Sequence, residues 1–184
     1  LIPFPIKTRI GINTGNMVVG NMGTDKKMNY TMMGNDVNLA ARLEGVNKVY
    51  HTWILVSEST WLAADSGENK GKIVARRMDK VRVVGINKPV QLYNIVGLRS
   101  EMSENELKSV DFFHQGLDRY LQRDFVNAKK YFDKADELFP ETVTCYNRDG
   151  STYKENGPAS VFSARCTKNI TEGIPPNWDG VVNL

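Results

Sequence analysis

The sequence predicts an α+β fold, with mixed strands and helices at residues 1–98 and an all-helical segment at residues 99–184. In the first segment, short runs of apolar residues separated by glycine turns indicate strands. From Ser103 onward, apolar residues recur at the 3.6-residue spacing of amphipathic helices. This change of pattern near Arg99 predicts a domain boundary there, giving two domains at 1–98 and 99–184.

Three strands are expected at the start of the first segment. Residues 7–13 alternate into one strand, and a Thr-Gly-Asn turn leads to an apolar run at 17–22. A polar tip at 24–27 separates that run from a third one at 28–33. Because the tip is short and polar, the second and third runs predict a hairpin.

A helix is expected directly after this hairpin. Gly34 breaks the third strand, and Asn35 or Asp36 can cap the helix because their side chains accept free first-turn amides. The helix is expected to reach about Leu43 and to stop at Gly45. A strand at 54–56 and a helix at 57–64, which begins at Ser57, should follow. A polar loop at 65–72 then leads to two closing strands at 73–85 and 89–97.

The second segment is expected to contain a pair of helices at 103–121 and 124–139. A loop at 141–157, a helix at 158–170 and a rigid Pro-Pro turn anchored by Trp178 should follow. Six residues fall at the spacing of a tetratricopeptide repeat, in which small residues allow two helices to approach closely: Phe112, Gly116, Ala128, Phe132, Ala135 and Pro140. One repeat buries its own faces poorly, so the later helix is expected to cover it.

Composition excludes several classes of protein. Lys and Arg number 24 and Asp and Glu number 21, a net charge of +3 with no basic cluster, so a nucleic-acid partner is not expected. The two cysteines, Cys145 and Cys166, fit a reducing cytoplasm without a disulfide framework. No apolar run reaches the roughly 18 residues that span a bilayer. The chain starts at Leu1, so we expect a fragment of a longer cytoplasmic protein, whose missing N-terminal part leaves room for a membrane anchor.

The strongest functional signal is the stretch from Asn29 to Gly45, which contains Asn38 and Arg42. Residues at i and i+4 share one face of a helix, so an amide and a fixed cation would point the same way. That combination suits a sugar and a phosphate. An isolated pair of this kind is more often an ordinary solvated pair, and only the surrounding motif favours function.

The motifs that surround this pair resemble class III adenylate and guanylate cyclases. Arg9–Gly15 with Val18–Gly23 resembles a hairpin, Tyr30–Leu43 a substrate motif, and Val81–Gly85 with Pro89–Tyr93 a closing strand pair. The resemblance covers about residues 7–97 and implies the C-terminal half of the catalytic domain, with a partial ferredoxin-like sheet and flanking helices. The second segment is similar to a tetratricopeptide-like extension found on some bacterial adenylate cyclases.

The resemblance also implies roles for single residues. Thr31 lies at the purine-selecting position and favours ATP, because a short acceptor there takes a hydrogen bond from the adenine amino group. Asn38 would orient the ribose, and Arg42 would neutralise charge at the α-phosphate during 3′-hydroxyl attack. The products would be cyclic AMP and pyrophosphate, so the parent protein would be a lyase. Thr31 also fits a plain strand residue chosen for β-propensity.

The chain departs from the family pattern at the positions that bind the metal ions, the base and the triphosphate, and this limits the expectation of cyclase activity. The family's two metal-binding aspartates and its base-reading lysine lie upstream of this chain, so the parent would use Mg²⁺ or Mn²⁺ with no metal ligand here. Val84 stands where the family usually has a triphosphate-binding lysine, and Lys88 or Arg82 are the candidate replacements. The family forms head-to-tail dimers with shared sites, so a second cyclase protomer is an expected partner.

Three hypotheses therefore remain open. The chain is a cyclase fragment that is inactive alone, a pseudo-cyclase that binds nucleotide without turnover, or a tetratricopeptide-like module that binds a protein through its helical tail. Met28, Met32 and Met33 are expected to belong to a core or a dimer surface, and not to a cofactor site.

Overall fold

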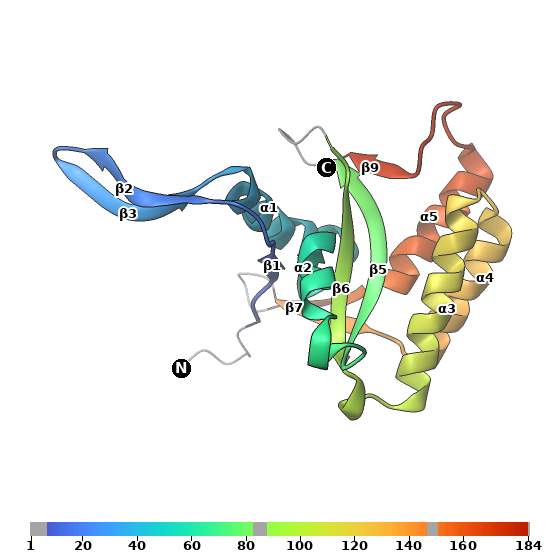
Figure 1. The fold of residues 1–184 in the computed structure, drawn as a ribbon. Coiled ribbons are helices and arrows are strands. Elements are labelled where there is room, and N and C mark those ends of the chain that lie inside the picture. Colours follow the sequence, from blue (N-terminus) through green and yellow to red (C-terminus); the bar gives the residue numbers. More distant parts are fainter. Residues whose placement is uncertain (1–6, 83–87, 147–150, 184) are drawn as a thin grey trace.

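A five-stranded mixed sheet forms the centre of the computed structural model, which describes residues 7–82, 88–146 and 151–183. The strands follow the order β1, β4, β6, β5 and β9, with bounds Ile10–Ile12, Ile54–Ser57, Val90–Leu98, Ile73–Arg82 and Val181–Asn183. β1 runs parallel to β4 and β5 parallel to β9, whereas β6 is antiparallel to both of its neighbours. The predicted α+β class is confirmed (Figure 1).

A hairpin of β2 (Val18–Thr24) and β3 (Lys27–Met33) projects away from the sheet (Figure 1). The two strands pair antiparallel from Val18 opposite Met33 to Thr24 opposite Lys27, as the sequence predicted. All seven residues of β3 are exposed, so Met28, Met32 and Met33 do not belong to the core of this chain. The hairpin is therefore an arm with exposed apolar side chains.

Helix α1 (Asn35–Tyr50) is longer than predicted and begins differently. The prediction that it stops at Gly45 is wrong, because Val46, Asn47 and Tyr50 are buried beyond that glycine. Their burial outweighs the roughly 1 kcal/mol that glycine costs inside a helix. The prediction of an Asn35 or Asp36 cap is also wrong. The N-cap is Gly34, which has φ 151° and no side-chain hydrogen bond.

Side chains cap the next three α-helices, and a proline begins the last one. Ser57 accepts from the N–H of Thr60 at the start of α2 (Glu58–Ala64). Ser103 and Glu106 form a capping box at the start of α3 (Glu104–Leu121), and Asp124 caps α4 (Phe125–Leu138). Pro158 occupies the first turn of α5 (Pro158–Glu172). Short 3₁₀ turns at Gly67–Asn69 and Arg99–Glu101 complete the helical elements of the described residues.

Residues 141–157 do not form the loop that was predicted. They hold an antiparallel hairpin of β7 (Thr142–Tyr146) and β8 (Thr152–Asn156). Their Thr and Tyr content favours strands, which the glycine and asparagine residues between the strands obscure in the sequence. With β9 added to the main sheet, residues 99–184 are not all-helical. The boundary between residues 98 and 99 stays a prediction.

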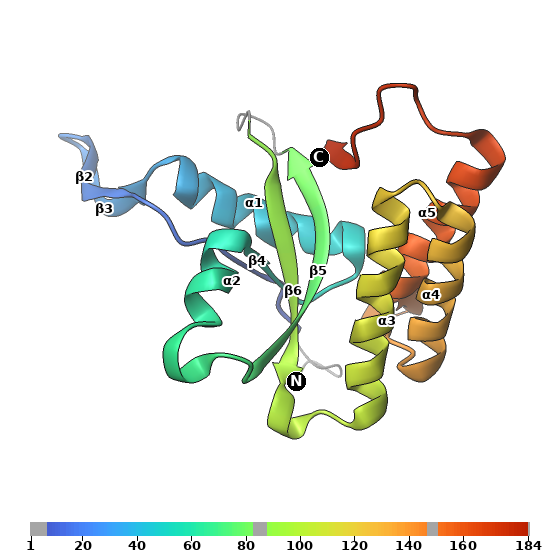
Figure 2. The same cartoon turned by 45° about the vertical axis from the view of Figure 1, so that its right-hand side comes forward.

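One hydrophobic core extends from the sheet into the three C-terminal helices, which stand beside β5 (Figure 2). The rings of Phe113, Phe132 and Phe162, one from each of these helices, have centroids 5.2 Å apart in each pair. A Cβ on Gly116 would lie 3.0 Å from the Phe132 ring, which explains the small residue there. The predicted close helix pair is confirmed, and its assignment as a tetratricopeptide-like repeat stays a prediction.

The C-terminal turn is anchored as predicted. The Trp178 ring lies 5.5 Å from the ring of Tyr120 and 5.8 Å from the ring of Phe125. These contacts place the following strand, β9, against the end of β5. Among the described residues, no helix has the length and apolar character needed to cross a bilayer.

Candidate functional site

Asn38 and Arg42 lie one turn apart on α1, as their spacing predicted. Asn38 is exposed and Arg42 half-buried, whereas Leu39 and Leu43 on the adjoining side of the helix are buried. Within the described part of the chain, neither the Asn38 amide nor the Arg42 guanidinium has a hydrogen-bond or ion-pair partner. The pair is therefore available to bind a ligand.

The sheet holds α1 in place through contacts that sequence reasoning did not find. Gly11 of β1 lies so close to the helix that a Cβ there would come within 2.3 Å of the Glu44 nitrogen. The buried Asn47 amide donates to the Ile10 carbonyl at 3.0 Å, and its oxygen accepts from the Thr52 hydroxyl at 2.8 Å. These contacts fix the rotation of α1, and so fix the direction in which Asn38 and Arg42 point.

The structure does not bring the other two predicted residues to this pair. Thr31 is exposed on the projecting β3, opposite Gly20 of β2. Lys88 is exposed before β6, and it lines a surface cavity of about 450 Å³ with the first turns of α1 and α2. Neither Asn38 nor Arg42 lines that cavity.

The structure distinguishes Lys88 from Arg82, the other candidate for binding the triphosphate. Val84 lies outside the described residues. Arg82, at the end of β5, pairs with the Asp179 carboxylate at 2.7 Å. Arg82 is therefore already engaged by the C-terminal segment. Lys88 is the better-exposed cation of the two candidates.

The described residues offer no metal site. Across residues 7–82, 88–146 and 151–183, no three His, Cys, Asp or Glu side chains are grouped closely enough to hold a metal ion. The residues present therefore do not fit the Mg²⁺ or Mn²⁺ pair that the resemblance implies for the parent.

A buried ionic cluster joins the sheet to α5. The Tyr50 hydroxyl donates to Asp79 Oδ2 at 2.8 Å, and the Arg165 guanidinium pairs with the same oxygen. Burial raises the pKa of Asp79, and the Arg165 charge opposes that rise. The Arg165 guanidinium also lies 5.0 Å from the Phe162 ring centroid. No local sequence pattern indicates this cluster, because its members are distant along the chain.

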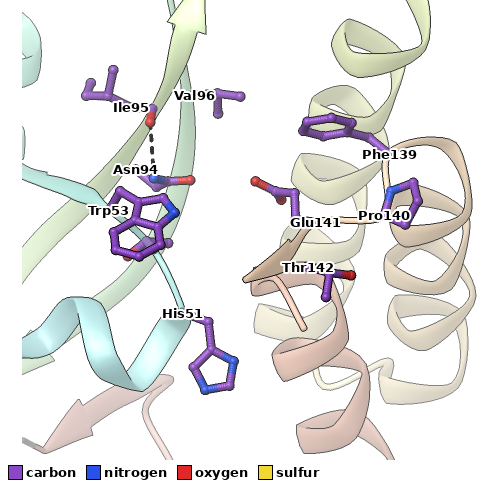
Figure 3. Close-up of a pocket in the computed structure, with 10 residues that line it drawn as sticks. His51, Trp53, Asn94, Ile95, Val96, Phe139, Pro140, Glu141 and Thr142 are labelled. Atoms are coloured by element: carbon purple, nitrogen blue, oxygen red, sulfur yellow. Dashed lines mark hydrogen bonds between the residues drawn. The ribbon is translucent and has the colours of Figure 1, made fainter. Parts of the chain in front are cut away.

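A second buried cation connects the sheet to the start of β7. The Arg76 side chain is 1% exposed, pairs with Glu141 Oε2 at 2.7 Å and donates to Asn94 Oδ1 at 3.3 Å. Figure 3 shows Glu141 facing Asn94 and Trp53 across a cavity of about 320 Å³. The sheet and the C-terminal segment both line this cavity, so the two segments are closely joined there.

His114 makes the contact between α3 and β5 sensitive to pH. Its Nε2 accepts from the Arg77 backbone N–H at 2.9 Å, which requires a neutral ring. Burial lowers the pKa of His114, as do the charges of Arg77 and Arg76, while Asp111 and Asp118 oppose this. In the folded state the ring therefore resists protonation.

We expect the free energy of unfolding to fall as pH drops below the ordinary histidine value of about 6.5. Below that pH the unfolded chain binds the proton more readily than the folded chain, so the contribution of His114 is complete above it and lost toward the lowered folded pKa. Urea unfolding at about pH 7.5 and about pH 5.5 tests this. The His114→Gln variant should lose less stability between the two values, and an equal loss would show that other groups cause it.

Residues 4–97 match the family model described as the adenylate and guanylate cyclase catalytic domain. A "terminal-differentiation specific" adenylate cyclase from Dictyostelium discoideum is 30% identical over 166 residues, which is 90% of this chain and 7% of that protein. Adenylate cyclase 1 of Rhizobium meliloti is 35% identical over 54% of this chain and 14% of its own length.

Among solved structures, the adenylyl cyclase CyaB from P. aeruginosa is similar at 36% identity, with a TM-score of 0.44. The match covers 55% of this chain and 48% of that one. This chain spans less than a fifth of the curated relatives named above. The family model ends at residue 97. The 166-residue Dictyostelium alignment is longer, so it necessarily extends into residues 99–184.

Proposed function

Because this chain belongs to the adenylate and guanylate cyclase catalytic domain family, we propose that it is part of an adenylate cyclase that converts ATP to cyclic AMP and pyrophosphate, and that it carries the C-terminal half of the catalytic domain. One observation carries this proposal. The Asn38 amide and the Arg42 guanidinium are presented one turn apart on a helix that the sheet holds rigidly, and no group of the described chain engages them. We expect the reaction to take place in the cytoplasm.

Arg42 supplies the electrostatic part of the proposed reaction. The ribose 3′-hydroxyl releases its proton to solvent as its oxygen attacks the α-phosphorus. The new P–O bond forms, and pyrophosphate leaves with the electrons of the broken bond. Negative charge grows on the α-phosphate oxygens during this step, and a fixed guanidinium aimed at them lowers the barrier. Asn38 orients the ribose so that the hydroxyl meets the phosphorus.

Thr31 and Lys88 serve the two ends of ATP in this proposal. The Thr31 hydroxyl accepts from the adenine amino group, and Lys88 meets the triphosphate. The exposure of both side chains supports these roles, since each is free to meet a ligand.

A second cyclase protomer is needed to complete the site. The β2–β3 arm supports this part of the proposal, because Val18, Met28, Tyr30, Met32 and Met33 are more than half exposed on it. An exposed apolar surface of this kind marks a place where another protein docks. A head-to-tail homodimer would cover the arm and bring the Thr31, Asn38 and Arg42 set of one protomer to the other half-site.

Mg²⁺ or Mn²⁺ would have to be held by carboxylates outside the described residues. We therefore expect the 184-residue chain to form no cyclic AMP by itself. The measurement is a turnover assay of the purified chain with ATP and Mn²⁺, with a complete class III cyclase as positive control. Product that scales with the amount of chain would contradict this expectation.

The C-terminal segment acts as a scaffold for the cyclase sheet in this proposal. The ion pairs Arg165–Asp79 and Arg76–Glu141, each with one fully buried member, support that role, together with the pairing of β9 and β5. Deletion of residues 99–184 from the parent should therefore abolish folding of the cyclase domain. A deletion variant that folds and keeps its activity would contradict the scaffold role.

A further inference from the structure

Helices α3 and α4 lie side by side (Figure 2), and their side chains line an open groove of about 650 Å³. None of the residues assigned to nucleotide binding lines it. The lining side chains are mostly basic or amphipathic: Arg119, Asn127, Lys130, Tyr131, Asp133 and Lys134. This groove is therefore separate from the proposed nucleotide site.

Among the described residues, three cations in the groove have no carboxylate within ion-pair distance, although the charges of Arg119 and Lys130 act on the nearby Asp124. In that part of the chain, Lys130 contacts the Asn127 amide oxygen at 3.3 Å, and Lys134 lies over the Phe112 ring at 5.4 Å. Other lysines of α3, α4 and α5 form ion pairs with neighbouring carboxylates. Lys108, Lys129 and Lys168 each pair with a carboxylate one turn away.

The acidic groups near the groove are occupied by contacts of their own. Asp133 accepts from the Lys129 ammonium at 2.7 Å and from the Ser163 hydroxyl at 2.5 Å. Asp124, which caps α4, accepts from the Asn127 side chain at 2.9 Å and from its backbone N–H at 3.3 Å. The groove therefore keeps an excess of positive charge.

An aromatic shelf lies beside these cations. The half-buried rings of Phe112 and Tyr131 have centroids 6.2 Å apart, inclined at 30°. Such a shelf offers an apolar contact in the middle of a charged surface. A bare inorganic anion would use the cations and leave the shelf uncovered.

We propose that this groove binds an extended acidic peptide segment of a partner protein, with carboxylates at Arg119, Lys130 and Lys134 and an aromatic side chain on the Tyr131 shelf. Charge complementarity selects the partner, and the shelf selects a peptide over a simple anion. Helices α3 and α4 would then link the cyclase sheet to a partner, since they share the hydrophobic core that supports the sheet.

The test is fluorescence anisotropy of the 184-residue chain with a labelled dodecapeptide of alternating aspartate and glutamate around one phenylalanine. Joint replacement Arg119→Ala, Lys130→Ala and Lys134→Ala should weaken binding by about 10-fold. The matched control, Lys48→Ala with Lys108→Ala and Lys168→Ala, removes the same charge from exposed positions outside the groove and should change binding by less than about 2-fold. Tyr131→Ala leaves the charge unchanged and should weaken binding by about 3-fold.

Two outcomes would overturn this proposal. The first is that both triple variants weaken peptide binding equally, or that the unaltered chain does not bind the peptide at all. Either result shows that the groove does not bind the peptide specifically. The second is displacement of the peptide by tripolyphosphate or by anionic phospholipid vesicles at matched charge, which shows a phosphate site. Circular dichroism of each variant confirms that the helices are intact. Cyclase activity is not part of the readout, so failure of this proposal is distinct from failure of the proposed function.

Discussion

Replacing Arg42 by alanine in the longer parent protein is expected to lower cyclic AMP formation by about 10²- to 10³-fold, or roughly 3–4 kcal/mol of transition-state stabilisation. The guanidinium has no partner within the described chain, so its removal leaves the fold intact and removes the cation that faces the developing phosphate charge. The measurement is kcat/KM for ATP with Mn²⁺. The loss should fall mainly on kcat, because the charge grows only during the reaction.

Lys48→Ala is the matched control for this variant, since Lys48 is an exposed cation in the last turn of the same helix. It should leave the rate within about 2-fold. A parent protein in which Arg42→Ala and the unaltered enzyme share the same background activity would contradict the cyclase assignment and favour a nucleotide-binding pseudo-cyclase.

Replacing Arg165 by methionine is expected to lower the free energy of unfolding of this chain by about 3–5 kcal/mol near neutral pH. Methionine keeps much of the contact with the Phe162 ring, but it leaves the Asp79 carboxylate buried without its cation. Because burial raises the pKa of Asp79, that carboxyl takes up a proton more readily as pH falls. The destabilisation should therefore shrink at acidic pH, and urea unfolding at two pH values measures both effects.

Two further variants separate the ionic contribution from general damage to α5. Lys168→Ala removes an exposed cation that pairs with Glu172 at 3.8 Å, and it should cost less than about 1 kcal/mol. The double variant Asp79→Leu with Arg165→Met should recover most of the lost stability, because no charge is then left unpaired. A double variant as unstable as the single one would show that shape, not charge, explains the loss.

Local patterns predicted the part of the molecule that carries the proposed chemistry. The polar tip between two apolar runs predicted the β2–β3 hairpin, and the spacing of Asn38 and Arg42 predicted one shared helix face. Both depend only on residues close together in the sequence. The end of α1 was missed because the burial of Tyr50 against residues of α5 outweighs the local signal of Gly45.

The rest could not be predicted because it depends on residues far apart in the sequence. From the sequence pattern, Asp79 is an ordinary polar residue of a strand, and Arg165 is an exposed residue of an amphipathic helix. Only the fold brings them together in a buried pair. The pairing of β9 with β5 likewise joins residues about a hundred positions apart, and no local pattern near Val181 indicates its partner.

Complementation tests the proposed role of Asn38 and Arg42 most directly. The parent protein carrying Arg42→Ala is co-expressed with this 184-residue chain, and cyclic AMP is measured. We expect the unaltered chain to restore product, because it supplies Asn38 and Arg42 to the metal-binding half of the parent. The same chain carrying Arg42→Ala should restore nothing. Equal product with both chains, or no gain from the unaltered chain bound to the parent, would contradict this role.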